Sequence, residues 1–515
     1  MLAKFARLHP LLMVLVVALG LRLPAVVFSR GYMASDDHYE TVNVAYNWLT
    51  EGMYSDDGNL RWRHHVDRDV ARNPLYTLAL LGIMKGYQAA GIMSLDTMMY
   101  GLRLLHALLS LATVWMVFAA VRLITRSDRW AVAAGLILAA QALMPFLSVR
   151  NLIEMVSAPF LAAAVYFLYS YQSDGRQRAL VWAGVLTGLA WMIRFPVALA
   201  ALPVPVVLVW ETRSLRPAMH YALGVSLVLL ASGLLDWMVI GSFAASTVNL
   251  FADFLEGGEA MYNTILLVYP VVILGFFVPP FSLVAAALCF SREMWRNHRL
   301  LITSILSFVV MHTLLANRQE RFMIPIIPLV AILFITALWQ HFRNGGVLAR
   351  RPRLFKAIVG VSVALNVLLL IPFTVNYGHK GLVEPLVKLD GCLPRPRVLM
   401  VSPDHAQIYP GQYAGYPLIY PAMANSWSDF AAAGAEADPP DLVFLYPPDS
   451  ALLPAYLDSV RVTWGEADLM FRVGPSTIDY VLHVLNPKYN PTHEMWAYRL
   501  GEKGAVDGAN DSAPL

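Results

Sequence analysis

Long uninterrupted apolar runs constrain this chain more than any other feature. Stretches of about 18 or more mostly apolar residues recur between Leu11 and Pro372, and each can cross a ~30 Å hydrocarbon core as a helix. The runs lack the alternation of a barrel strand, and a helix satisfies its own backbone groups in lipid. With 58% hydrophobic and only 14% charged residues, a water-soluble fold would expose far too much apolar surface. We therefore expect an all-α polytopic membrane protein.

The basic residues orient these spans. The eleven candidate spans are 10–28, 102–121, 131–148, 155–172, 179–194, 196–210, 217–240, 263–290, 299–316, 323–340 and 356–375. Lys4 and Arg7 place the N-terminus in the cytoplasm, and five further arginine-bearing loops then fall on the same side. This agreement requires the stretch 75–93, which contains Lys85, to re-enter the membrane or lie on its surface. The chain beyond about Val375 is then extracytoplasmic.

The sequence divides into a membrane body and an outer domain. Residues 1–375 form the body, and its first outer loop, 29–101, is long and polar. Residues 376–500 are long enough for a core of their own, so we expect a small C-terminal extracytoplasmic α/β domain. Residues 501–515 have the composition of a disordered tail. The expected strands of the domain are the short apolar segments 397–402 (RVLMVS), 441–446 (DLVFLY) and 468–473 (DLMFRV).

An acidic motif follows the first span. Ser35–Glu40 reads SDDHYE, which places two adjacent carboxylates, Asp36 and Asp37, beside His38. Such a pair can hold a metal, or one carboxylate can act as general base while the other tunes it. A solvated turn that caps the following helix would have the same composition, so the motif alone leaves both interpretations open.

A run of basic residues lies in the same outer loop, where the insertion rule does not favour them. Arginine forks match the geometry of phosphate groups, so a phosphate-bearing lipid is a natural partner. Nonspecific attraction to anionic headgroups is the alternative. The run comprises Arg61, Arg63, His64, His65, Arg68 and Arg72, followed by Asn73-Pro74.

Further charged residues lie at the outer ends of spans. Arginines here often only extend to the interface, and neighbouring opposite charges often form local salt bridges. A transporter would instead have polar groups at mid-membrane within broken helices. Clustering on one side therefore favours a one-sided active site that meets a lipid phosphate. The residues are Arg150, Asn151, Glu154, Arg194, Glu320 and Arg321.

In this order, the motifs resemble those of the GT-C glycosyltransferases, and most closely glycosyltransferase family 22, the dolichyl-phosphate-mannose-dependent mannosyltransferases. The resemblance covers about residues 1–340. Asp37 stands where the family has Glu, Asn317 where it has His, and Gln319 where it has Glu, and these departures bear on the sugar and acceptor more than on the reaction. The similar segments are Ser35–Glu40, Arg72–Leu75, Ser148–Glu154, Arg194–Pro196, Asp236–Gly241, Asn249–Tyr262 and Asn317–Phe322.

The resemblance implies an inverting transfer of a sugar, mannose in that family, from a polyprenyl phosphate to an acceptor hydroxyl. It implies Asp36 as the base that takes the hydroxyl proton, with Asp37 in support. It implies that arginines bind the donor phosphate, and that Glu320 orients Arg321. The phosphate-binding candidates are Arg321, Arg194, Arg150 and Arg72, and the supporting candidates are Glu320, His38, Glu154, Asn249 and Tyr262.

The expected partners are a polyprenyl-phosphate sugar donor, a glycan or glycolipid acceptor and membrane lipids. We expect no cofactor, no obligatory metal and no nucleic acid. The expected location is a bacterial plasma (inner) membrane with an extracytoplasmic active site, or the endoplasmic reticulum membrane in a eukaryote. Three alternatives stay open: a GT-C enzyme that glycosylates lipid A or protein with another sugar, a lipid-linked sugar transporter, and a structural or assembly protein.

Overall fold

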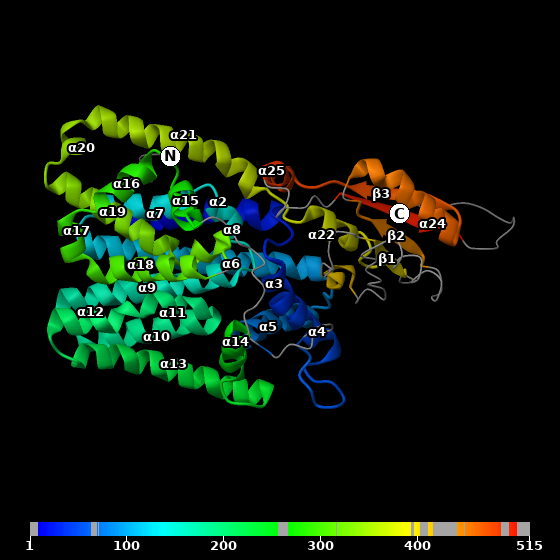
Figure 1. The fold of residues 1–515 in the computed structure, drawn as a ribbon, viewed down its shortest axis with the longest axis horizontal. Coiled ribbons are helices and arrows are strands. Elements are labelled where there is room, and N and C mark those ends of the chain that lie inside the picture. The colour runs from blue at the N-terminus through cyan, green and yellow to red at the C-terminus, as the bar shows by residue number, and fades with distance from the viewer. Residues whose placement is uncertain are drawn as a thin grey trace. The chain divides into compact units, whose positions relative to one another are not determined.

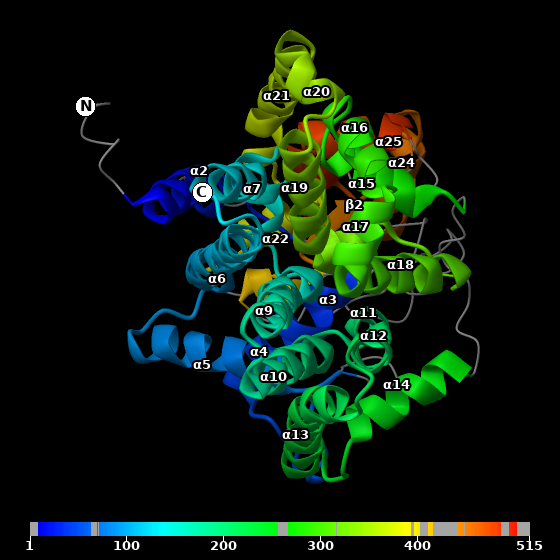
Figure 2. The ribbon, with the colours of Figure 1, turned by 90° about the vertical axis from the view of Figure 1, so that its left-hand side faces the viewer.

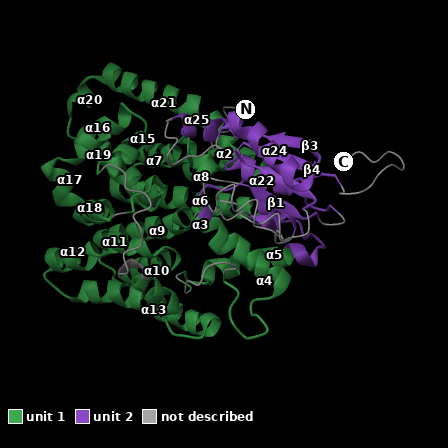
Figure 3. Ribbon diagram, turned by 45° about the vertical axis from the view of Figure 1, so that its right-hand side comes forward, with its two compact units in different colours: residues 1–29, 36–86, 100–376 green, residues 30–35, 87–99, 377–515 purple. Residues whose placement is uncertain are grey.

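The computed structural model describes residues 9–62, 70, 72–255, 266–315, 317–392, 396–401, 410–415, 440–447, 449–485 and 494–501. The chain forms two compact units (Figure 3). Unit 1 comprises residues 1–29, 36–86 and 100–376, and unit 2 comprises residues 30–35, 87–99 and 377–515.

The regular secondary structure among the described residues of unit 1 is helical (Figure 1). Two of its helices, α5 and α6, and the start of α3 extend into unit 2. The elements are α2 (Pro10–Phe28), α3 (Ser35–Asp37), η1 (His38–Asn43), α4 (Val44–Glu51), α5 (Leu75–Ala89), α6 (Leu95–Thr125), α7 (Asp128–Ala140), α8 (Met144–Leu147), α9 (Ile153–Asp174), α10 (Gln177–Ile193), η2 (Phe195–Val197), α11 (Ala198–Ala201), α12 (Pro203–Thr212), α13 (Arg216–Ile240), α14 (Ala245–Leu255), α15 (Val268–Phe276), α16 (Phe281–Cys289), α17 (Arg292–Asn297), α18 (Arg299–Leu314), η3 (Glu320–Ile326), α19 (Ile327–Arg343), α20 (Val347–Arg350) and α21 (Pro352–Thr374).

The expectation of an all-α membrane body is confirmed, and each of the eleven expected spans contains helix among its described residues. Within the described residues, seven helical segments are long and apolar enough to cross a membrane, or eight with a bent pair. The expected single span 263–290 is that bent pair, because α15 and α16 meet at 118°. The expected span 131–148 is broken after α7, where the Gln141 side chain accepts hydrogen bonds from the backbone of Leu143 and Met144. The stretch 75–93, expected not to cross, contains the 15-residue helix α5, which is not among the candidate spans.

Unit 1 has a buried centre and exposed outer helices. In the span Glu320–Arg343, 89% of the apolar window is buried, compared with 6% in Pro352–Thr374. Figure 2 shows α21 and α13 at opposite edges, with α19 and α9 between them. The outer helices present apolar side chains such as Leu368 and Met238, as expected of surfaces that contact lipid acyl chains.

Helices α10 and α13 approach closely because glycines meet at their crossing. A Cβ atom on Gly184 would lie 2.1 Å from the Tyr221 carbonyl oxygen, and one on Gly224 would lie 2.2 Å from the Val181 carbonyl oxygen. Small residues at such a crossing let helix backbones pack in lipid, where no hydrophobic force drives them together. This packing fixes α13, which carries Asp236 to the site described below.

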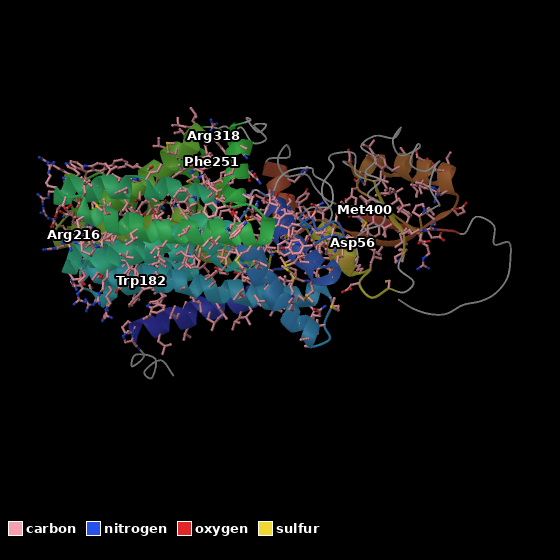
Figure 4. All side chains as sticks on the ribbon, turned by 90° about the horizontal axis from the view of Figure 1, so that it is seen from below. Asp56, Trp182, Arg216, Phe251, Arg318 and Met400 are labelled. Atoms are coloured by element: carbon pink, nitrogen blue, oxygen red, sulfur yellow. The ribbon has the colours of Figure 1, made fainter. Side chains whose placement is uncertain are left out.

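Loops that were expected on opposite sides of the membrane lie at opposite ends of unit 1. Figure 4 shows Arg216, from an expected cytoplasmic loop, and Asp56, from the expected outer loop, at opposite ends. The Tyr54 hydroxyl donates a 3.1 Å hydrogen bond to the Val239 carbonyl, at the end of α13 remote from Arg216. The polar outer loop therefore gathers at one end of the helices.

Unit 2 contains a four-stranded mixed sheet with the order β1-β2-β4-β3. Strands β1 and β2 are parallel, and β4 pairs antiparallel with both β2 and β3. The core cluster against α24 (Leu453–Trp464) includes Val443, Val460, Trp464 and Trp496. The small α/β domain is thus confirmed, and its three predicted strands correspond to β1 (Val398–Val401), β2 (Leu442–Leu445) and β3 (Ala467–Val473), whereas β4 (Met495–Leu500) was not predicted. The remaining described elements are α22 (Lys380–Val387), η4 (Gly411–Ala414), η5 (Ser450–Leu452) and α25 (Thr477–Leu485). Beyond Gly501, the tail expected to be disordered lies outside the described residues.

Candidate active site

Asp37 is a buried anchor. Its carboxylate accepts a 3.1 Å hydrogen bond from the backbone N–H of Ile153, the first residue of α9. It also binds Arg72 at 2.7 Å and lies 3.6 Å from Arg321. A carboxylate at a helix N-terminus satisfies a free N–H and interacts favourably with the helix dipole. Asp37 therefore joins α3 to α9 and leaves little of its carboxylate free for chemistry.

Asp36, the neighbouring residue, has a different environment. Its side chain is 45% exposed, whereas that of Asp37 is 1% exposed. Arg321 lies 2.7 Å from its Oδ2 atom, and Arg72 lies 3.5 Å from the same atom. Partial burial alone would raise the pKa of Asp36, but the two guanidinium groups lower it to about 2. Asp36 is therefore an ionised carboxylate that is accessible to solvent.

Arg321 and Arg194 lie over one aromatic ring. Their guanidinium carbons are 5.6 Å and 4.8 Å from the centroid of Phe322, within the range of cation–π attraction. The buried carboxylate of Glu154 lies 3.0 Å from Arg194 and 3.9 Å from Arg321. Within the described residues, the buried Nη1 of Arg321 and Nε of Arg194 have no hydrogen-bond acceptor. Each of the two arginines thus keeps one buried N–H group without a hydrogen-bond acceptor, and both lie near Glu154.

The chain on both sides of Arg72 is fixed by hydrogen bonds. Its guanidinium contacts Asp36, Asp37 and Glu40. Next to it, the Asn73 amide donates to Asp236 at 3.0 Å. Two residues before it, the Val70 carbonyl accepts a 3.0 Å hydrogen bond from Asn249 of α14. These contacts fix Val70 and Asn73 of the long outer loop against α14 and α13.

A second, uncharged network lies behind Asp37. The Asn151 amide donates to the Asp37 carbonyl at 3.2 Å and to the Thr41 hydroxyl at 2.7 Å. The Tyr76 hydroxyl donates to Asn151 and lies 2.6 Å from Nε2 of His106. Burial and the nearby Asp37 raise the pKa of Tyr76, so the phenol stays protonated and can donate. No sequence motif pointed to Tyr76 or Thr41, because their contacts with Asn151 join residues distant in sequence.

Several predicted site residues lie elsewhere or act differently. Arg150 is buried, and its guanidinium donates to the carbonyls of Ser29 and Asn376 at 2.9 Å, which gives it a part in packing rather than in the cluster of Asp36. His38 is fully buried, and burial together with Arg150 lowers its pKa to about 3. The imidazole is therefore neutral near pH 7, although it adjoins Asp37 in sequence.

Arg321 is oriented by a residue other than the expected one. Glu320 is exposed, and the Nε of Arg321 donates a 2.7 Å hydrogen bond to Gln319. The local pair expected between Glu320 and Arg321 is replaced by ion pairs to Asp36, Asp37 and Glu154, which lie far away in the sequence. Tyr262 and the basic residues Arg63, His64, His65 and Arg68 lie outside the described residues.

Among the residues whose placement is described, no group of three or more His, Cys, Asp or Glu side chains could hold a metal ion. Within the cluster, Asp36, Asp37 and Glu154 each face at least one arginine. The carboxylates of this cluster are therefore paired with guanidinium groups.

Comparison with known proteins identifies the fold. The family model for dolichyl-phosphate-mannose-protein mannosyltransferases matches residues 82–237. No curated protein sequence matches the chain. The structure of ArnT from Cupriavidus metallidurans bound to undecaprenyl phosphate is similar, with 16% identity, a TM-score of 0.59, and coverage of 96% of this chain and 98% of that one. Its apo structure gives a TM-score of 0.58 at 16% identity, covering 95% of this chain and 97% of that one.

The oligosaccharyltransferase of Archaeoglobus fulgidus, determined with zinc and sulfate, is also similar, with 14% identity and a TM-score of 0.53. The match covers 89% of this chain and 70% of that chain. Together with the family-model match, these similarities show that the chain has the GT-C fold of glycosyltransferases. The closer assignment to glycosyltransferase family 22 is not confirmed.

Proposed function

We propose that this protein is a membrane glycosyltransferase that moves a sugar from a polyprenyl phosphate to an acceptor hydroxyl with inversion. Three findings support the proposal: the GT-C fold, the match to a family described as dolichyl-phosphate-mannose-dependent, and the similarity to ArnT determined with undecaprenyl phosphate. The chemistry itself is argued from the charge cluster of this chain.

The exposed carboxylate of Asp36 carries the proposal. Of the two adjacent carboxylates, Asp37 is sealed by a helix N-terminus and two arginines, whereas Asp36 is accessible. A base must reach the hydroxyl proton that it abstracts. The two arginines that hold Asp36, Arg321 and Arg72, are groups that also bind phosphate oxygens well.

In the proposed reaction, Asp36 accepts the proton of the acceptor hydroxyl as its oxygen forms a bond with the anomeric carbon. The bond between that carbon and the phosphate oxygen breaks, and its electron pair leaves on the polyprenyl phosphate. Negative charge therefore grows on a phosphate oxygen, where fixed cations stabilise the transition state. Arg321, Arg72 and Arg194 supply these cations.

The low pKa of Asp36 makes it ionised but a weak base, since a general base works best with a pKa near the working pH. Binding of the donor phosphate resolves this conflict. The phosphate competes with Asp36 for the guanidinium groups of Arg321 and Arg72. As these ion pairs weaken, the pKa of Asp36 rises, so the base becomes stronger only when the donor is in place.

Mannose is the sugar that we propose, because the matching family is described by dolichyl-phosphate mannose. We propose a lipid-linked or glycan acceptor and an extracytoplasmic site at the end of unit 1 that bears the long outer loop. A protein acceptor is the second candidate, since the same family description names protein mannosyltransferases. We propose the plasma membrane as the location.

The test is transfer from radiolabelled polyprenyl-phosphate mannose by the reconstituted protein, with a membrane lipid extract or a Ser/Thr-containing peptide as acceptor. Wild type should give labelled product, and Asp36→Asn should give less than about one part in a thousand of it, in line with losses at essential acid–base groups. Asp56→Asn, which alters an exposed carboxylate of the same outer loop, is the matched control and should be fully active.

The outcomes separate the parts of the proposal. Equal product from wild type and Asp36→Asn would keep the enzyme and reject Asp36 as the base. Product with another polyprenyl-phosphate sugar but not with mannose would reject only the sugar. No covalent product with any polyprenyl-phosphate sugar, together with movement of the lipid across the bilayer, would favour a transporter.

A further inference from the structure

Helix α25 (Thr477–Leu485) of unit 2 exposes apolar side chains on one face. Tyr480 and Val484, one turn apart, are 56% and 62% exposed, and Val481 is also exposed. These side chains share one helix face, because residues three and four apart lie together. Asp479 and His483 lie on the opposite side and are only partly exposed, and Leu482, 42% exposed, lies on that side too. A helix that faced water would have the reverse arrangement.

This helix also stands apart from the core of its unit. The sheet cluster is completed by α24 and does not include α25. Figure 1 shows α25 apart from α24. The exposed apolar face of α25 is therefore not a mispacked part of the sheet core.

The chain itself keeps unit 2 close to the membrane. Unit 2 starts at Arg30, two residues after the end of α2 at Phe28, and again at Tyr377, three residues after the end of α21 at Thr374. Both α2 and α21 are candidate membrane spans. A unit connected by such short segments cannot move far from the bilayer surface, since an extended residue spans at most about 3.6 Å.

The two connections are also joined to each other within unit 2. The backbone N–H of Gly378 donates a 3.0 Å hydrogen bond to the Arg30 carbonyl, and Gly31 pairs with Gly378. A Cβ atom on Gly31 would lie 1.9 Å from the Gly378 carbonyl oxygen, so only glycine permits this approach. The base of unit 2 is thus a short, closed link rather than a flexible tether.

We propose that α25 lies in the membrane interface, with its Tyr480, Val481 and Val484 face inserted between lipids, as an anchor of unit 2. Interfacial helices combine a large apolar face with polar residues on the other side. Tyrosine suits this depth, because its ring is apolar and its hydroxyl reaches the headgroup region. The occupant is a lipid surface, and neither a second copy of the chain nor another protein is needed.

The test uses the full-length protein in lipid nanodiscs, with Cys289 and Cys392 replaced by serine and a nitroxide attached at Val484→Cys. Accessibility to oxygen, which concentrates in the bilayer, is compared with accessibility to a water-soluble nickel chelate. Val462→Cys is the matched control, because this valine is 88% exposed on α24 of the same unit.

We expect the label at Val484 to be at least threefold more accessible to oxygen than to the nickel chelate, and the label at Val462 to show the opposite. Equal behaviour of the two labels would place α25 in water and overturn the proposal. Shielding of Val484 from both reagents would indicate a protein contact and would also overturn it. Val481→Asp, on the same face, should abolish the oxygen preference at Val484, whereas Val462→Asp should leave it unchanged.

Discussion

Two groups of arginines in unit 1 are held in opposite ways. Arg22, in the middle of α2, donates to the Ser110 hydroxyl at 2.6 Å and to the carbonyls of Ala18 and Ala139. Arg150 likewise binds the carbonyls of Ser29 and Asn376. Arg72 and Arg321 instead bind carboxylates.

The partners decide what each arginine can do. A backbone carbonyl is fixed by the helix to which it belongs, so Arg22 and Arg150 cannot change partners without moving helices. A carboxylate side chain can give way to another anion of similar geometry. Arginine beside carboxylates, at an accessible edge, is therefore suited to exchange its partner for a phosphate, whereas arginine among carbonyls serves packing.

Substitution of Arg321 should give the largest loss of activity and is the strongest test of the contrast between the two groups of arginines. Replacement by Gln removes a cation that lies 2.7 Å from Asp36, and loss of one such stabilising group typically lowers kcat about 10²–10³-fold. Arg321→Lys should recover only a small part, because an ammonium cannot reproduce the planar fork. Steady-state transfer with wild-type protein as reference measures both. Full activity of Arg321→Gln would show that the exchange of partners plays no part in catalysis.

A smaller effect is expected at Asp236, which acts on Arg72 through Asn73. Asp236→Ala also removes acceptors of two hydrogen bonds from Ser246, so the outer loop should lose its anchor on α13. We expect kcat to fall about 10-fold to 100-fold, with the protein still folded. Asp236→Asn keeps one acceptor oxygen and should recover part of the rate, and an unchanged rate in both variants would remove Asp236 from the positioning network.

The dependence of kcat/KM on pH should show an effect of intermediate size. Because the pKa of Asp36 lies below its ordinary value of 3.8, at about 2, stabilisation from its ion pairs is present above about pH 4 and is lost as the pH falls toward 2. In wild type, kcat/KM should therefore stay flat down to about pH 4. Arg72→Gln leaves the burial but removes one cation, so the acid limb should move to higher pH. An acid limb at the same pH in both proteins would contradict the coupling.

The smallest effect on activity is expected at Arg22. Arg22→Met should leave kcat within about threefold of wild type, since Arg22 binds only groups of the helix packing. Its loss leaves buried hydrogen-bond acceptors unpaired, which lowers the free energy of unfolding by about 1–3 kcal/mol. The melting temperature should therefore fall by several degrees. A large loss of kcat without a loss of stability would show that the two groups of arginines are not distinct in function.

The sequence predicted the elements that depend on local composition. The apolar runs located the membrane helices, and the acidic motif after the first span located Asp36, because both signals lie within a few consecutive residues. The contact between Arg321 and Asp36 joins residues 285 positions apart and needs the fold. Glu320 was expected to orient Arg321, but it lies exposed at the first residue of η3, and Gln319 accepts the hydrogen bond from Arg321 instead.

Arg150 shows the limit of the argument from topology. Its position at the end of a span suggested the same role as Arg321, yet it lies buried among carbonyls of Ser29 and Asn376. Burial and hydrogen-bond partners separate the two cases, and neither can be read from spacing. Strand β4 was missed although the Trp and Tyr of MWAYRL favour strands, because the segment has no β-branched residue.

The exposure of α21 has a consequence for how the protein responds to its bilayer. Only 6% of its apolar window is buried by protein, so little packing holds its tilt, and hydrophobic mismatch can change it at low cost. With 23 residues, the helix is about 34 Å long at 1.5 Å per residue, slightly more than a typical hydrocarbon core. In a thinner bilayer α21 would tilt, and Thr374, from which the chain enters unit 2, would shift. The acyl-chain length of the surrounding lipid should therefore set the tilt of α21 and, with it, the position of the segment that follows Thr374.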